Sequence, residues 1–292
     1  MAKNVNIYVA AALFLPPIPA VSKKTISSRE KDRRDMEILI GLTVPMLGTV
    51  LGASTVLLLR DRISQIANNA MLGFASGIMV AASFWSLLQP ALEQSGEGLA
   101  NNWPVLAGFI AGMAFLLLLD TFIPHQHTDS KAAEGPKSSL SRSTKMILAV
   151  ALHNIPEGMA VGVVLAGVIN GDTNLTVAGS LALSIGMAIQ NIPEGAIISV
   201  PLRVEGKSRG RAFLMGALSG VVEPVAAIAT MLFLGSNTGS MPSLLAFAAG
   251  AMLYVVVEEL IPSSQHGRHS NVGTVCFAAG FAIMMVLDTV MG

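Results

Sequence analysis

The chain has 292 residues, of which 52% are hydrophobic and only 12% are charged, and its formal net charge is zero. Soluble domains carry about 25% charged residues, so this composition indicates a membrane protein. The neutral balance provides no basic field for a nucleic-acid partner. The single cysteine, Cys276, excludes a disulfide framework and a cysteine-rich metal site within one chain.

The first 35 residues are predicted to form a separate N-terminal segment. Residues 6–21 are apolar, but the stretch is short and contains Pro16, Pro17 and Pro19 near its end. The cleavage pattern near Ala20 is weak, so an additional helix or a peripheral segment is favoured over a signal peptide. A charged linker follows this stretch.

Residues 36–292 consist of eight apolar runs, each long enough to cross a bilayer as a helix. No soluble domain fits between the runs, so the sequence predicts one all-α, polytopic domain embedded in lipid. The predicted spans are Met36–Leu59, Ala70–Leu92, Trp103–Ile123, Lys145–Ile169, Thr176–Pro201, Arg211–Leu234, Met241–Ile261 and Val272–Met291.

Basic residues occur in alternate connections between these spans, which predicts the orientation of the chain. By the positive-inside rule, the first, third, fifth and seventh connections are cytoplasmic and the C-terminus lies outside. The basic residues before the first span, at positions 23–34, disagree with this orientation. The basic residues of the first, third, fifth and seventh connections are Arg60, Arg62, Lys131, Lys137, Arg142, Lys145, Arg203, Lys207, Arg209, Arg211 and Arg268.

One motif occurs twice inside the apolar runs, as HNIPEG at residues 153–158 and QNIPEG at residues 190–195. His153 and Glu157 are four residues apart and share a helix face, and so do Gln190 and Glu194. The proline in each copy removes a backbone donor and frees a carbonyl group. In the predicted antiparallel helices both motifs lie at a similar depth, so they are expected to form one site. Its amide candidates are Asn154, Gln190 and Asn191.

Further acids lie along the later spans. Glu223 is in the middle of the sixth span and is followed by a proline. Glu259 and Asp288 are either ligands along a pathway, members of a proton relay, or structural polar groups. His125 and His127 in the third connection are weak metal signals, because ordinary surface histidines also occur in such loops.

These residue types together predict a metal site. Ionisable residues inside a membrane are costly and are usually functional, and buried bare carboxylates need a cation or a proton. Three glutamates with one imidazole and several amide oxygens suit Zn(II), Fe(II), Mn(II) or Cd(II) better than Cu(I). A structural hinge built on the prolines is the alternative interpretation.

On these motifs the chain resembles the ZIP family of divalent metal transporters, in particular its bacterial branch. The resemblance covers about residues 36–291 and implies metal movement into the cytoplasm, with a rigid four-helix unit that slides against the rest. It implies one metal bound by His153, Glu157, Gln190 and Glu194. It implies a second metal bound by Asn154, Glu157, Asn191, Glu194 and Glu223, so that the two motif glutamates bridge.

The predicted function is therefore import of divalent transition metals across the plasma (inner) membrane, with zinc as the leading candidate and iron, manganese or cadmium as others. A cation channel and a metal exporter are the alternatives, since both would use the same ligands. A zinc protease would need a His-Glu-x-x-His motif, which the fourth span lacks, so no enzyme activity and no cofactor are expected. The oligomeric state stays open, a homodimer included.

Overall fold

The computed structural model describes residues 28–58, 63–126, 135–235, 238–267 and 271–291. Residues 1–27 of the predicted N-terminal segment lie outside this range. The described part of the chain is built from helices and their connections, and the predicted all-α class is confirmed. Eight helical segments are long and apolar enough to cross a membrane, as predicted from the apolar runs.

Five spans are continuous helices and three are interrupted. The continuous helices are α2 (Ser28–Leu58), α5 (Leu99–Phe122), α6 (Arg142–Asn170), α7 (Val177–Val204) and α12 (Val272–Met291). The second span consists of α3 (Gln65–Ala82), the π-helix η1 (Ser83–Leu88) and α4 (Gln89–Ser95), and the sixth of α8 (Arg209–Ser219) and α9 (Val222–Leu234). After the short η2 (Thr238–Ser240), the seventh consists of α10 (Met241–Val255), the π-helix η3 (Val256–Leu260) and α11 (Ile261–Ser264).

Local signals at the helix ends explain where the central helices begin and end. The hydroxyls of Ser141, Thr176 and Ser208 accept a backbone N–H in the first turn of α6, α7 and α8, respectively. The helix α6 ends at Asn170 and is followed by Gly171, which has a φ of 76°. Glycine suits this left-handed conformation, because a side chain there would be strained.

The three interruptions each precede or contain a proline. A proline cannot donate to the carbonyl group four residues earlier, so the helix widens or breaks nearby. The π-helices η1 and η3 end two residues before Pro90 and Pro262, respectively, and α9 begins two residues before Pro224. The apolar runs by themselves do not locate these interruptions, and the structure shows where the backbone departs from a regular α-helix.

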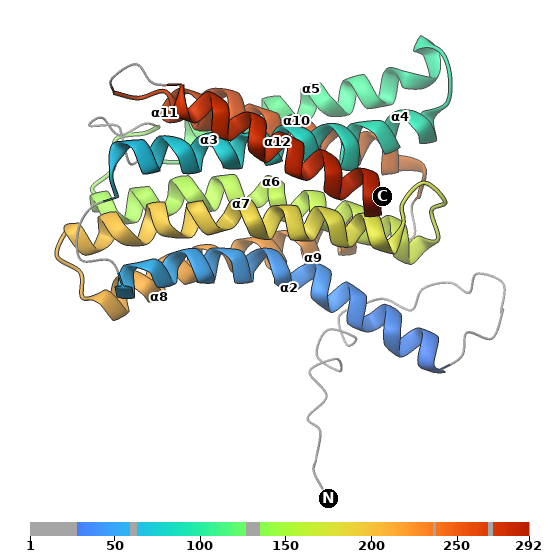
Figure 1. Cartoon of the computed structure of the whole chain (residues 1–292). Helices are drawn as coiled ribbons and strands as arrows, with labels where there is room; N and C mark the ends of the chain where they lie inside the picture. The colour runs from blue at the N-terminus through green and yellow to red at the C-terminus, as the bar shows by residue number, and fades with distance from the viewer. Residues whose placement is uncertain (1–27, 59–62, 127–134, 236–237, 268–270, 292) are drawn as a thin grey trace, which may run out of the picture.

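The helices form two sets that meet along α6 and α7. In the first set, α2 packs on α7 and α8, and α6 packs on α9. In the second set, α3 packs on α12, and α5 packs on α10. Figure 1 shows α6 and α7 between a layer of α3, α5, α10 and α12 and a layer of α2, α8 and α9. The paired motifs therefore lie in the middle of the molecule.

Glycines allow helices of the same set to touch backbone to backbone. A Cβ atom added at Gly52 of α2 would lie 2.0 Å from the carbonyl oxygen of Ile192 in α7, and one at Gly162 of α6 would lie 2.4 Å from that of Ala227 in α9. In the second set, Gly77 and Gly112 make the same kind of approach to α12 and α10, respectively. Small residues at helix contacts are how membrane helices pack closely.

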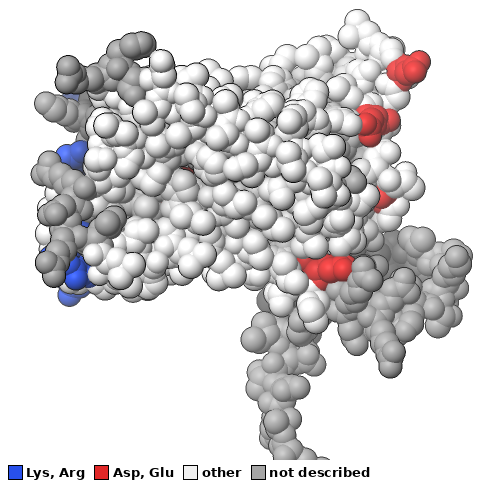
Figure 2. Space-filling model, viewed as in Figure 1, with Lys and Arg blue, Asp and Glu red and all other residues white. Residues whose placement is uncertain are grey.

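Charged residues are segregated along the long axis of the molecule. On the face shown in Figure 2, lysine and arginine side chains gather at one end and aspartate and glutamate side chains at the other. The basic end is where α8 begins, and α12 ends toward the opposite end (Figures 1 and 2). On this face, the two ends of the molecule therefore differ in charge.

The close contact at Gly52 generates a prediction about stability. A methyl group in Gly52→Ala would overlap the Ile192 carbonyl, so we expect a loss of about 1–3 kcal/mol in the free energy of unfolding. Thermal unfolding of the purified protein in detergent would measure it. Gly210→Ala is the matched control, because a Cβ atom there meets nothing within 4 Å. Equal melting temperatures for the two variants would contradict the close contact.

Candidate metal centre

The motif helices run without a break through their prolines and bring the motif side chains together. Pro156 lies inside α6 and Pro193 inside α7. All seven residues predicted to hold metal on the fourth, fifth and sixth spans are buried. They are His153, Asn154, Glu157, Gln190, Asn191, Glu194 and Glu223.

The two motifs meet at Glu157. The Gln190 amide donates a hydrogen bond from Nε2 to Oε1 of Glu157 at 2.7 Å, which joins α7 to α6. The carboxyl groups of Glu157 and Glu194 lie close enough to interact. Each motif helix therefore brings one acid to the place where the two motifs meet.

Glu223 from α9 lies beside this pair and is held by two donors. Asn191 donates from Nδ2 to Oε2 of Glu223 at 2.8 Å, and the Thr49 hydroxyl of α2 donates to Oε1 at 3.2 Å. The same Asn191 amide nitrogen also donates to the carbonyl oxygen of Pro45 in α2, at 3.1 Å. Three helices, α2, α7 and α9, thus contribute to this side of the site.

The break between α8 and α9 orients Asn154. The Glu223 N–H donates to the carbonyl of Gly220 instead of that of Ser219, so the Ser219 carbonyl is available to another donor. Asn154 donates to it from Nδ2 at 2.9 Å. The nitrogen of the amide is fixed in this way, while its oxygen Oδ1 is buried and has no hydrogen-bond donor among the described residues.

On the other side of the pair, His153 contacts Glu259. The Nε2 atom of His153 lies directly against the carboxylate of Glu259, which is part of η3. A cavity of about 30 Å³ adjoins them and is also lined by Glu194 and Gln126. The structure therefore adds Glu259 to the central group.

Four oxygen atoms of the central residues are buried and accept no hydrogen bond from the described part of the chain. They are Asn154 Oδ1, Glu157 Oε2, Gln190 Oε1 and Glu194 Oε2. An unsatisfied buried acceptor costs about 1–3 kcal/mol, so native structures contain few of them. A divalent cation prefers such oxygen donors and would satisfy several at once.

The arrangement is not a simple cluster of acids and histidines. Among the described residues, no three His, Cys, Asp or Glu side chains are close enough to hold a metal by themselves. The reason is that amides alternate with the acids and donate to them, as Gln190 does to Glu157. The buried oxygens of this centre therefore come from amides as well as from acids.

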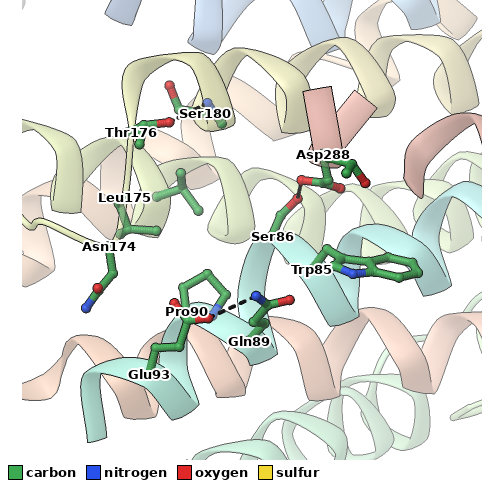
Figure 3. Close-up of a pocket in the computed structure, with 13 residues that line it drawn as sticks. Trp85, Ser86, Gln89, Pro90, Glu93, Asn174, Leu175, Thr176, Ser180 and Asp288 are labelled. Carbon is green, nitrogen blue, oxygen red and sulfur yellow. Dashed lines mark hydrogen bonds between the residues drawn. The ribbon is translucent and has the colours of Figure 1, made fainter. Parts of the chain in front are cut away.

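Asp288 lies in a separate cavity toward the acidic end of the molecule. Its carboxylate accepts a hydrogen bond from the Ser86 hydroxyl at 2.7 Å (Figure 3). This cavity has a volume of about 370 Å³ and is also lined by Gln89, Glu93 and Asn174. Asp288 is thus a separate polar group and not a member of the central site.

His125 belongs to a third polar group. Its Nε2 atom lies 2.9 Å from Oδ1 of Asp120, and Tyr254 donates to Oδ2 of the same carboxylate at 3.3 Å. His125 is fully buried, contrary to the ordinary behaviour of a loop histidine. Glu258 and Asp120 line a small cavity with His153 and Glu259, which places this group beside the central site. His127 lies outside the described residues.

Sequence reasoning missed the partners supplied by α2 and by the helix breaks. Thr49 and the carbonyl oxygens of Pro45 and Ser219 carry no motif of their own. Gln126 could have been suspected only as a neighbour of His125. The one sequence signal for the contribution of α2 was Pro45 four residues before Thr49 in an apolar run. Such a pattern is common in membrane helices.

Comparison with known proteins supports the same interpretation. Residues 123–288 match a family model described as ZIP Zinc transporter. The chain belongs to the ZIP family. It is 38% identical over 259 residues to the zinc transporter ZIPB of Bordetella bronchiseptica, covering 87% of this chain and 81% of that protein.

Other ZIP relatives are also named zinc transporters. The chain is 37% identical to GufA of Myxococcus xanthus, over 86% of this chain and 99% of that protein. It is 34% identical to human ZIP11, over 84% of this chain and 94% of that protein. The family and the eight apolar helices establish a multi-pass membrane protein of a zinc transporter family.

The two donations by Asn191 generate a prediction. Asn191→Asp would replace the donor with a carboxylate beside Glu223 and the Pro45 carbonyl, so we expect the metal-free protein to lose about 1–3 kcal/mol of stability. The added charge should also strengthen zinc binding. Melting temperatures with and without zinc would show a lower starting value and a larger zinc-induced increase.

Asn271→Asp provides the control, since Asn271 is exposed. This variant should melt as the unmodified protein does under both conditions. An Asn191→Asp variant that is as stable as the unmodified protein without zinc would be incompatible with the hydrogen bonds described above.

Proposed function

We propose that this protein carries divalent zinc across the plasma (inner) membrane into the cytoplasm through the centre on α6, α7 and α9. The observation that supports this most directly is the set of four buried oxygens without hydrogen-bond donors on the two motif helices. The names of the ZIP relatives agree with zinc as the substrate. Iron, manganese and cadmium share the same ligand preferences and are further candidate substrates.

The proposed centre has two adjoining subsites. The primary subsite takes His153, Glu157, Gln190 and Glu194, and Gln190 offers its oxygen after its amide turns away from Glu157. The second subsite takes Asn154, Asn191 and Glu223, together with the two glutamates that bridge. In the metal-free protein, the amide N–H groups of Gln190 and Asn191 donate to Glu157 and Glu223, respectively, and so interact with the carboxylates that would otherwise bind the cation.

The distribution of charge supports the direction of transport. The basic end is assigned to the cytoplasm by the positive-inside rule, which places the C-terminus outside (Figures 1 and 2). The cavity that contains Asp288 then faces the outside, and the small cavity beside His153 and Glu259 lies toward the cytoplasm. Zinc would pass the first on entry and the second on release.

We infer that α2, α6, α7 and the α8–α9 span move as one unit relative to the other four spans. The glycine contacts that join backbone to backbone lie within each set of helices. Between the sets, the atoms nearest to a Cβ added at Gly186 of α7 belong to the side chains of Met284 in α12 and Ile78 in α3. When the two sets of helices slide past one another, contacts between side chains can be exchanged more easily than close contacts between backbones.

A channel and an exporter would use the same ligands. In a channel, the closely packed helices that contain the site would not need to move. Zinc uptake through a channel would also not saturate at low zinc concentration. An exporter would differ only in direction. Zinc uptake into liposomes of known protein orientation distinguishes all three.

The central experiment measures radioactive zinc uptake by proteoliposomes over a range of zinc concentrations. The unmodified protein should show saturable uptake. Glu157→Ala and Glu194→Ala should each lower it to the level of empty liposomes, because each removes a bridging ligand from both subsites. Glu97→Ala, which changes an exposed glutamate, should leave the uptake unchanged.

Retained uptake in both site variants, with normal protein incorporation, would refute the proposed site. Uptake that rises linearly with zinc concentration would support a channel. Glu157→Gln keeps the shape of the side chain, so it controls for loss of folding in the alanine variants.

The imidazole of His153 should influence which metal is preferred. In His153→Ala the primary subsite keeps only oxygen ligands, which favours Mn(II) over Zn(II) relative to the unmodified protein. Competition between zinc and manganese in the uptake assay would measure the change as a ratio of inhibition constants. An unchanged ratio would show that the imidazole does not coordinate the transported metal.

A further inference from the structure

The hydroxyl of Thr49 differs from the other described hydroxyls of helix α2. Those of Thr43, Ser54 and Thr55 donate to carbonyl groups three or four residues earlier in the same helix. This is the usual local bond of serine and threonine in membrane helices. Thr49 instead donates across to Oε1 of Glu223, which is 174 positions later in the chain.

Thr49 is also fully enclosed and closely held. Its exposed fraction is 0%. A Cβ atom at Gly195, next to the motif glutamate of α7, would lie 2.1 Å from the Thr49 carbonyl oxygen. A Cβ atom at Gly220, in the break before α9, would lie 2.8 Å from the Thr49 Cβ. The absence of side chains at both glycines allows Thr49 to reach its position.

The two oxygens of Glu223 have different partners. Oε2 is held by Asn191, whose amide must turn to offer its oxygen when a cation enters the second subsite. Oε1 is held by Thr49, whose hydroxyl need not move for that exchange. A hydrogen bond to the outer oxygen of a ligating carboxylate fixes the orientation of the ligand, and its loss typically weakens metal binding about 10- to 100-fold.

We propose that Thr49 is a positioning residue for the second subsite, so that α2 supplies an outer contact of the zinc centre although it contributes no ligand. The inference rests on the proposed function, because it assigns a role within the same centre. Thr49 keeps the Glu223 carboxylate in place while Asn191 changes from donor to ligand. It thereby sets the affinity of the second subsite with little effect on the primary one.

Zinc binding to the full-length protein in detergent, followed by calorimetry, tests this inference. The unmodified protein should bind two zinc ions, the weaker one at the second subsite because that subsite contains no imidazole, and Glu157→Ala should lose both. Thr49→Val, which has nearly the same shape but no hydroxyl, should weaken the weaker ion at least about tenfold and leave the stronger ion unchanged. Thr49→Ser should restore the affinity, because it retains the hydroxyl.

Thr43→Val is the matched control on the same helix, since the Thr43 hydroxyl bonds only within α2. It should bind both ions as the unmodified protein does. Two results would overturn the inference while the proposed function stands: unchanged binding of the weaker ion in Thr49→Val, or equal weakening in the valine and serine variants.

Zinc uptake by the same variants distinguishes a failure of the proposed function from a failure of the role assigned to Thr49. If the unmodified protein neither binds nor transports zinc, the proposed function fails and the role of Thr49 fails with it. If the unmodified protein transports zinc but binds a single ion, only the inference about Thr49 and the second subsite is wrong.

Discussion

Close approach of helix backbones is the constraint on which the rest of this structure depends. Each copy of the motif ends in a glycine directly after its glutamate. A Cβ atom at Gly158 would lie 2.3 Å from the carbonyl oxygen of Glu223, and one at Gly195 would lie 2.1 Å from that of Thr49. The two motif glycines therefore bring to the centre the acid of α9 and the hydroxyl that holds it.

The centre balances unpaired oxygens against hydrogen-bond donors. Gln190 and Asn191 each donate to a glutamate, which reduces the repulsion among three acids that share a low-dielectric space. Four other oxygens have no donor in the described part of the chain. An amide can offer either its nitrogen or its oxygen, so the same side chains can support both the metal-free and the metal-bound centre.

Prolines also shape the centre, because they lie next to the irregular parts of its helices. Pro224 follows the break that frees the Ser219 carbonyl for Asn154, and Pro262 follows the π-helix that carries Glu258 and Glu259. Inside a membrane, each carbonyl group that loses its helical donor must find another partner. Polar side chains of the centre are thus tied to the backbone at the places where the helices are irregular.

The sequence by itself determined the eight spans, the all-α class and the pairing of the motifs, because apolar length and the four-residue spacing of His153 and Glu157 are local properties. It could not place Thr49, Glu259 or Asp288. Thr49 and Glu259 reach the centre from α2 and η3, while Asp288 binds Ser86 in another cavity. Those positions follow from glycine contacts and π-helix geometry between segments far apart in the chain, which only the tertiary structure decides.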